Sequence, residues 1–174
     1  MMRWIACCTS AVVLAGAPGC NESSPSAAAD TPAASASWLL AAEPADVRPV
    51  GEAKADAAEG DKVVVVGRIG GRVEPITSDS TVFTIVDLKL KHCGELKGDT
   101  CPYPWDYCCE PRDSLTANSV TVQLVTPDGS PMTIDPIAAG LDPLDEVVVV
   151  GTVGPRPSPE VLVIRATAVH LRDG

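Results

Sequence analysis

The order of apolar and polar positions predicts β-strands over most of the second two-thirds of the chain. Apolar residues alternate with polar ones or form short β-branched runs, and glycine, proline and aspartate separate these segments. Alternation with a period of two places one set of side chains on one face of a strand. Strands are expected at residues 62–73, 81–88, 119–125, 146–153 and 161–171.

The segments between the expected strands leave room for little helix. Gly67, Gly70 and Gly71 interrupt the first strand, which indicates a coiled or bulged strand of the kind that barrel closure requires. Residues 135–141 fit one or two helical turns that begin at Asp135 and stop at Gly140. The chain is therefore expected to be all-β, as a small barrel or sandwich.

The order of two strands, a third strand, a short helix and two more strands resembles the OB-fold. Residues 60–69 are similar to the first strand of such domains, 83–87 to the second, and 141–153 to the entry into the fourth. The resemblance covers roughly residues 60–172. It implies a five-stranded OB-fold-like Greek-key barrel with one short helix between strands 3 and 4 and a Cys-rich insertion between strands 2 and 3. Domains of this fold bind oligonucleotides, oligosaccharides or proteins.

This chain lacks the residues that two known roles of such domains require, base stacking and haem attachment. The first strand holds none of the aromatic side chains that stack on bases. An exported haem chaperone of this fold attaches haem through a late His-x-x-x-Tyr, and no Tyr follows His170. A net charge of −10 also repels phosphate, so it argues against nucleic acid as a partner and permits cationic partners such as metal ions or basic peptides.

The first twenty residues show the pattern of an export signal. Arg3 precedes an apolar or small stretch at residues 5–17 that is too short to cross a bilayer as a helix. Residues 17–20, Ala-Pro-Gly-Cys, resemble a bacterial lipobox. The resemblance implies a lipid on Cys20 that anchors the protein to a membrane of the cell envelope, facing the periplasm or the exterior. The competing interpretations are an uncleaved anchor and a plain signal peptide that leaves Cys20 a free thiol.

These observations divide the chain into three parts. Residues 1–19 are expected to be a lipoprotein signal peptide, 20–60 a largely disordered linker, and 61–173 the folded domain. Residues 21–37 are rich in Ala, Ser, Pro and Thr and contain no large apolar side chain, so they cannot bury enough surface to fold. A short apolar patch at residues 38–40 interrupts the linker.

Four cysteines lie within residues 93–109, in the expected insertion: Cys93, Cys101, Cys108 and Cys109. An even number of cysteines in an oxidising compartment favours two disulfides. A bond between the neighbouring Cys108 and Cys109 would be strained. The pairs are therefore Cys93–Cys108 with Cys101–Cys109, or Cys93–Cys109 with Cys101–Cys108, and each bridge would contribute about 2–3 kcal/mol.

Two further hypotheses use the same cysteines. The four thiolates, with His92 as an additional candidate ligand, could bind zinc or cuprous copper, although the segment contains no Cys-x-x-Cys. Thiol exchange at Cys108 and Cys109 would require a low pKa, which the neighbouring acidic residues Asp106 and Glu110 oppose.

Three aromatic residues, Tyr103, Trp105 and Tyr107, alternate inside the cysteine segment. In an extended stretch they share one face, which would either pack over the barrel or form a binding surface for a protein or glycan. The sequence contains no nucleophile elbow, phosphate loop or His-rich metal motif. The sequence therefore favours a non-enzymatic module of the cell envelope that has no cofactor. This module would bind its partner through a disulfide-stapled aromatic loop. The alternative is a zinc- or copper-handling or thiol-redox protein.

Overall fold

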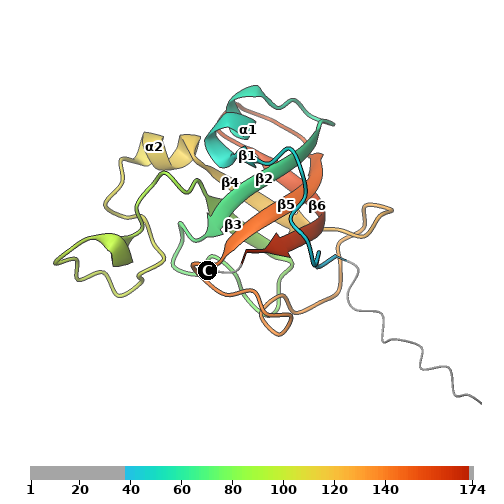
Figure 1. The fold of residues 1–174 in the computed structure, drawn as a ribbon. Helices are drawn as coiled ribbons and strands as arrows, with labels where there is room; N and C mark the ends of the chain where they lie inside the picture. Colours follow the sequence, from blue (N-terminus) through green and yellow to red (C-terminus); the bar gives the residue numbers. More distant parts are fainter. Residues whose placement is uncertain (1–37, 173–174) are drawn as a thin grey trace, which may run out of the picture. The chain divides into compact units, whose positions relative to one another are not determined.

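The computed structural model describes residues 38–172, which form a closed five-stranded β-barrel (Figure 1). The barrel strands follow the order β2-β3-β4-β6-β5, and β5 pairs back with β2. This confirms the predicted fold class, a small all-β barrel of the OB type. No helix within the described residues is long and apolar enough to cross a membrane. The strands are β2 (Lys62–Ile69), β3 (Val82–Val86), β4 (Ser119–Leu124), β5 (Glu146–Val153) and β6 (Val163–Leu171).

Two pairings between distant segments close the barrel. β2 runs antiparallel to β5 over residues 62–68, and β4 runs parallel to β6 over residues 121–124. The β5–β6 register shifts between Val150 and Gly151, because β6 carries an extra, bulged residue, Thr167, between the partners Ala166 and Ala168. A Cβ at Gly151 would meet the backbone oxygen of Arg165 at 2.4 Å. Since backbone cannot move aside as a side chain does, glycine is required where β5 and β6 approach each other.

Residues 38–60, predicted to be part of the linker, are instead packed on the barrel. Trp38 is 4% exposed, and the Val169 amide of β6 donates to its carbonyl at 2.6 Å. The short strand β1 (Arg48–Pro49) pairs in parallel with β2, and helix α1 (Val50–Asp56) buries Val50 and Ala53. The folded domain thus includes these residues. The rest of the predicted linker, the signal peptide and Cys20 lie outside the described residues.

The helix predicted between the third and fourth barrel strands is reduced to a single capped turn. The Asp135 carboxylate accepts from the amides of Ile137 and Ala138 at 2.9 and 3.0 Å, as the predicted N-cap should. Gly140 then adopts a left-handed φ of +99° that ends the turn.

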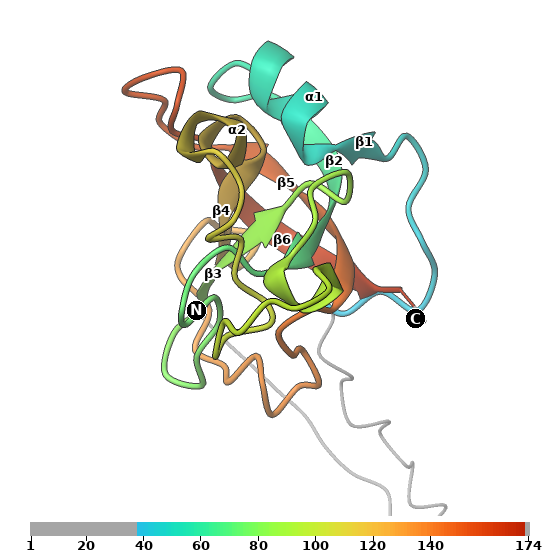
Figure 2. The same cartoon turned by 90° about the vertical axis from the view of Figure 1, so that its left-hand side faces the viewer.

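The predicted Cys-rich insertion between the second and third barrel strands is present, between β3 and β4. It contains the one-turn helix η1 (Cys93–Glu95) and helix α2 (Arg112–Ala117). Figure 1 shows the insertion projecting from one side of the barrel, and in Figure 2 this side faces the viewer.

Candidate functional site

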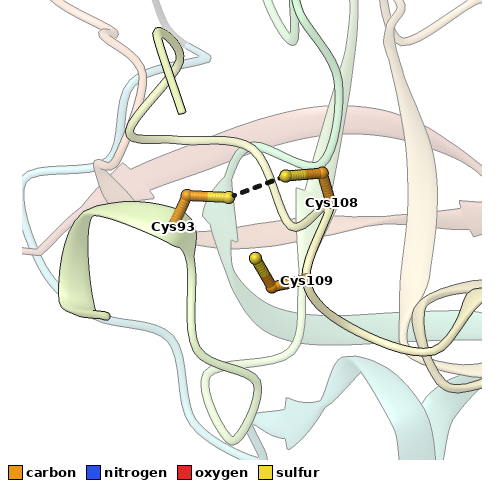
Figure 3. A group of neighbouring side chains, drawn as sticks. All are labelled: Cys93, Cys108 and Cys109. Atoms are coloured by element: carbon orange, nitrogen blue, oxygen red, sulfur yellow. Dashed lines mark hydrogen bonds between the residues drawn. The ribbon is translucent and has the colours of Figure 1, made fainter. Parts of the chain in front are cut away.

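The four cysteines of the insertion converge on one point. The Cys93 and Cys108 sulfurs are 3.3 Å apart, and the Cys108 and Cys101 sulfurs are 3.8 Å apart. Figure 3 shows the Cys93, Cys108 and Cys109 side chains directed toward one another, with their sulfurs all within 4.8 Å. The Cys101 sulfur also lies within 4.8 Å of that of Cys93.

The two predicted disulfides are not formed. All four cysteines in residues 38–172 are free thiols, and their sulfurs are too far apart for a bond. The nearest pair, Cys93 and Cys108, occurs in one of the two predicted connectivities. The sequence could establish that the cysteines belong together, but spacing alone does not fix their partners.

Backbone hydrogen bonds bring the two ends of the cysteine segment side by side. The Cys93 amide donates to the carbonyl of Asp106 at 2.8 Å, and the Gly94 amide donates to that of Pro104 at 2.9 Å. These bonds place the first turn of η1 against residues 104–106, so Cys93 faces the chain just before Cys108. A Cβ on Gly94 would crowd Pro104 at 3.1 Å, which explains a glycine there.

The insertion is also attached to the barrel through the glycines that end the first barrel strand. The Gly71 amide donates to the Trp105 carbonyl at 3.0 Å, and the Trp105 indole N–H donates to the Val73 carbonyl at 3.0 Å. A Cβ on Gly70 would meet the Trp105 carbonyl oxygen at 2.6 Å. These glycines therefore let the insertion backbone approach the barrel, a role that their position at a strand break did not reveal.

The three aromatic residues do not share one face, which corrects the predicted binding surface. Tyr107 is fully buried in a small second core with Val86 and Leu90. Tyr103 remains 37% exposed, and its ring centre lies 6.1 Å from that of the half-buried Trp105. The Asp106 amide donates to the Tyr103 carbonyl, so the chain turns here. A turn breaks the alternation on which the prediction depended.

His92, the additional candidate metal ligand, is occupied by other contacts. Its Nδ1 lies 2.8 Å from the Pro104 carbonyl oxygen and its Nε2 lies 3.0 Å from a carboxylate oxygen of Glu95. In this arrangement His92 holds the insertion together and has no ring nitrogen left for a metal. Asp99 and Asp106, which the sequence did not single out as ligands, each have a carboxylate oxygen within 4.8 Å of the Cys101 sulfur.

Three of the four thiols, those of Cys93, Cys108 and Cys109, have a raised pKa. Burial raises the pKa of Cys93 to about 12, and its contacts with Cys108 and Cys101 add to this. The hydrogen bond with Cys93 lowers the pKa of Cys108, but contact with Cys101 and desolvation outweigh it, and the pKa is raised. For Cys109 the contact with Cys108 lowers the pKa, whereas desolvation and the negative charge of Asp99 produce a net rise. Protonated thiols are poor nucleophiles.

Comparisons with known proteins add little to this geometry. No family model and no curated protein matches the chain. Among solved structures, the chain is similar to a putative aspartyl-tRNA synthetase from Leishmania major Friedlin, with 11% identity and a TM-score of 0.40. The alignment covers 72% of this chain and 20% of that one, so the chain spans about a fifth of that protein's length.

Proposed function

We propose that this chain is a non-enzymatic metal-binding module of the cell envelope, which holds one zinc or cuprous ion through Cys93, Cys101, Cys108 and Cys109. The observation that carries the proposal is the clustering of the sulfurs: those of Cys93, Cys108 and Cys109 lie within 4.8 Å of one another, and that of Cys101 lies 3.8 Å from Cys108 and within 4.8 Å of Cys93. Zinc–sulfur bonds of about 2.3 Å in a tetrahedron place the sulfurs roughly 3.8 Å apart. The cluster therefore needs little rearrangement to surround one ion.

Thiolate ligands favour zinc and cuprous copper over harder ions. The raised pKa values of Cys93, Cys108 and Cys109 count against the thiol-exchange alternative, because exchange requires an accessible thiolate. They do not oppose metal binding, since a metal ion displaces thiol protons as it binds. Binding at neutral pH should accordingly release protons.

The envelope location rests on the pattern of residues 1–20, which supports a lipid on Cys20 and attachment to a membrane. In a bacterial host, the wild-type protein should carry the mass of the lipid and remain with the membrane fraction. A Cys20→Ser variant should lose both properties. Unchanged lipid mass and membrane retention in that variant would refute the anchor.

The metal proposal is tested on the chain from residue 21 onward, purified without added metal from an oxidising compartment and kept anaerobic. Elemental analysis, native mass spectrometry and thiol counting should show one zinc or cuprous ion per chain and four thiols that the metal protects from alkylation. Titration of the metal-free protein with Co²⁺ should produce thiolate-to-metal charge-transfer absorption. Cys108→Ser, which removes the sulfur that contacts both Cys93 and Cys101, should weaken metal binding and lower this absorption by about a quarter or more, because at most three thiolates remain.

His92→Ala provides the matched control. It should retain metal stoichiometry and charge-transfer absorption, because both ring nitrogens of His92 are already occupied. Four thiols blocked as two disulfides, with no bound metal, would overturn the proposal. The exposed Tyr103 and the half-buried Trp105 beside it would then remain as a contact surface for a protein or glycan on a disulfide-stapled loop.

A further inference from the structure

A cavity of about 810 Å³ lies between α1, α2 and the loop that follows β5. None of its lining residues belongs to the cysteine cluster. Part of its wall is apolar, formed by Ala55, Ala117 and Pro159. The cavity is also lined by four basic side chains: Lys54, Lys89, Arg112 and Arg156. These are four of the 13 Lys and Arg residues in a chain whose net charge is −10, so the cavity is rich in positive charge for this protein.

Lys54 is a buried charge that no carboxylate within residues 38–172 contacts at ion-pair distance, although the exposed Glu160 attracts it from farther away. Lys54 is 6% exposed, and its ammonium donates to the carbonyls of Thr116 and Ser119 at 2.5 and 2.7 Å. An ammonium carries three protons, and the third has no hydrogen-bond partner within residues 38–172. Nor does Lys54 form an ion pair with any carboxylate in that part of the chain. A buried charge is costly unless it is paired.

The other basic residues extend this positive region from the wall to the mouth of the cavity. Arg156 is fixed by hydrogen bonds to the carbonyls of Lys54 and Pro159, at 2.8 and 2.9 Å, and to that of Ala57. Burial lowers the pKa of Lys54, repulsion from Arg156 lowers it further, and the negative charge of Glu160 opposes both with a smaller effect. Lys89 and Arg112 are exposed, and the Lys89 ammonium lies 3.9 Å from a carboxylate oxygen of the buried Asp87. The acidic lining residues, Asp113 and Glu160, are exposed to solvent.

We propose that this cavity binds a small organic anion, whose carboxylate or phosphate group supplies the missing partner of Lys54. Lys89 and Arg112 at the mouth would attract the same group, and Ala55, Ala117 and Pro159 would contact its apolar body. This ligand site is separate from the metal site and does not depend on it.

The proposal is tested by calorimetric titration of the full mature chain with decanoate and decyl phosphate, kept below their micelle concentrations. At least one of these anions should bind with one molecule per chain. Decanol and decylammonium should bind more weakly by about tenfold or more, because they lack the negative charge. Equal binding of decanol would overturn the anion assignment. Equal binding of inorganic phosphate would overturn the role of the apolar wall, and no binding by either anion would overturn the site.

Variants locate the binding within the cavity. Lys54→Met should weaken anion binding by about tenfold to a hundredfold, as expected for a lost charge-assisted hydrogen bond. Because Lys54 also joins α1 to α2 and β4, Ala117→Phe provides a second test, which fills the cavity without touching that ammonium. Lys97→Ala removes an exposed lysine outside the cavity and should leave anion binding unchanged. Unaltered binding in both Lys54→Met and Ala117→Phe would place the ligand elsewhere and refute the proposal.

Discussion

Trp38 provides the sharpest test of where the folded domain begins. Its side chain is 4% exposed and belongs to the main hydrophobic core, and its carbonyl accepts the Val169 amide of β6. Truncating a buried Trp to Ala costs about 3–5 kcal/mol, as transfer free energy and cavity formation together. Domains of this size are stable by about 5–15 kcal/mol. Trp38→Ala should therefore remove a large fraction of the stability.

Urea unfolding followed by far-ultraviolet circular dichroism measures this loss. With an m-value of about 1–3 kcal/mol/M, the midpoint should fall by about 1 M or more. Trp38→Phe should cost less, since the buried indole N–H of Trp38 has no hydrogen-bond partner to lose within residues 38–172. Val73→Ala, at a residue that is 49% exposed, should change stability by less than about 0.5 kcal/mol. If Trp38→Ala behaves like Val73→Ala, residues 38–60 are a tether after all and the packing argument is refuted.

Three further changes test the barrel and the insertion. Tyr107→Phe should leave stability within about 1 kcal/mol, because within residues 38–172 the buried hydroxyl has only the Arg68 guanidinium near it and makes no well-formed hydrogen bond. A loss above about 2 kcal/mol in urea would mean that the hydroxyl is bonded to Arg68. Gly151→Ala should lower the free energy of unfolding by about 3 kcal/mol or more, since the added Cβ would clash with the Arg165 carbonyl oxygen. An unchanged melting temperature would contradict the close approach of β5 and β6 at this position. In the reduced, metal-free chain, folded Cys93 keeps its proton until about pH 12, whereas the unfolded chain releases it near pH 9. The stability that this contributes should be complete below pH 9 and decline as the pH rises further. A Cys93→Ser variant should show a shallower decline in urea midpoints, since Cys108 and Cys109, whose pKa values are also raised, remain.

The barrel could be predicted because its strands alternate in a way that is visible in the sequence. β4, for example, buries every second residue, including Val120 and Val122. The packing of the segment before the barrel could not, because outside the short patch at residues 38–40 its composition is that of a linker, rich in Ala, Pro, Glu and Asp. Trp38 and Val50 become core residues only through contact with strands that are distant in the sequence.

For the candidate site, the sequence supplied the participants but not their arrangement. The four cysteines were identified together, and the structure places them together. Tyr107 was expected either to pack over the barrel or to form a binding surface, and it packs in a small core. His92 was named only as an additional candidate ligand, and its contacts with Pro104 and Glu95 depend on the turn at residues 103–106 and on the Gly94–Pro104 hydrogen bond. Lys54 went unnoticed because its burial is created by α2 and β4, more than sixty residues away.

The way the insertion is held bears on how it would use a metal ion. In a zinc finger, metal binding and folding occur together. Here Arg68 of β2 pairs with Glu95 of η1 at 3.2 Å and with Glu146 of β5 at 2.8 Å, which ties the insertion to a barrel that has its own core. The metal is therefore not needed to form the fold. The carboxylates of Asp99 and Asp106 add negative charge where thiolates must form, and this opposes the loss of the thiol protons. We therefore expect an ion that is held less tightly than in a purely structural four-cysteine site and can be exchanged, which fits metal handling.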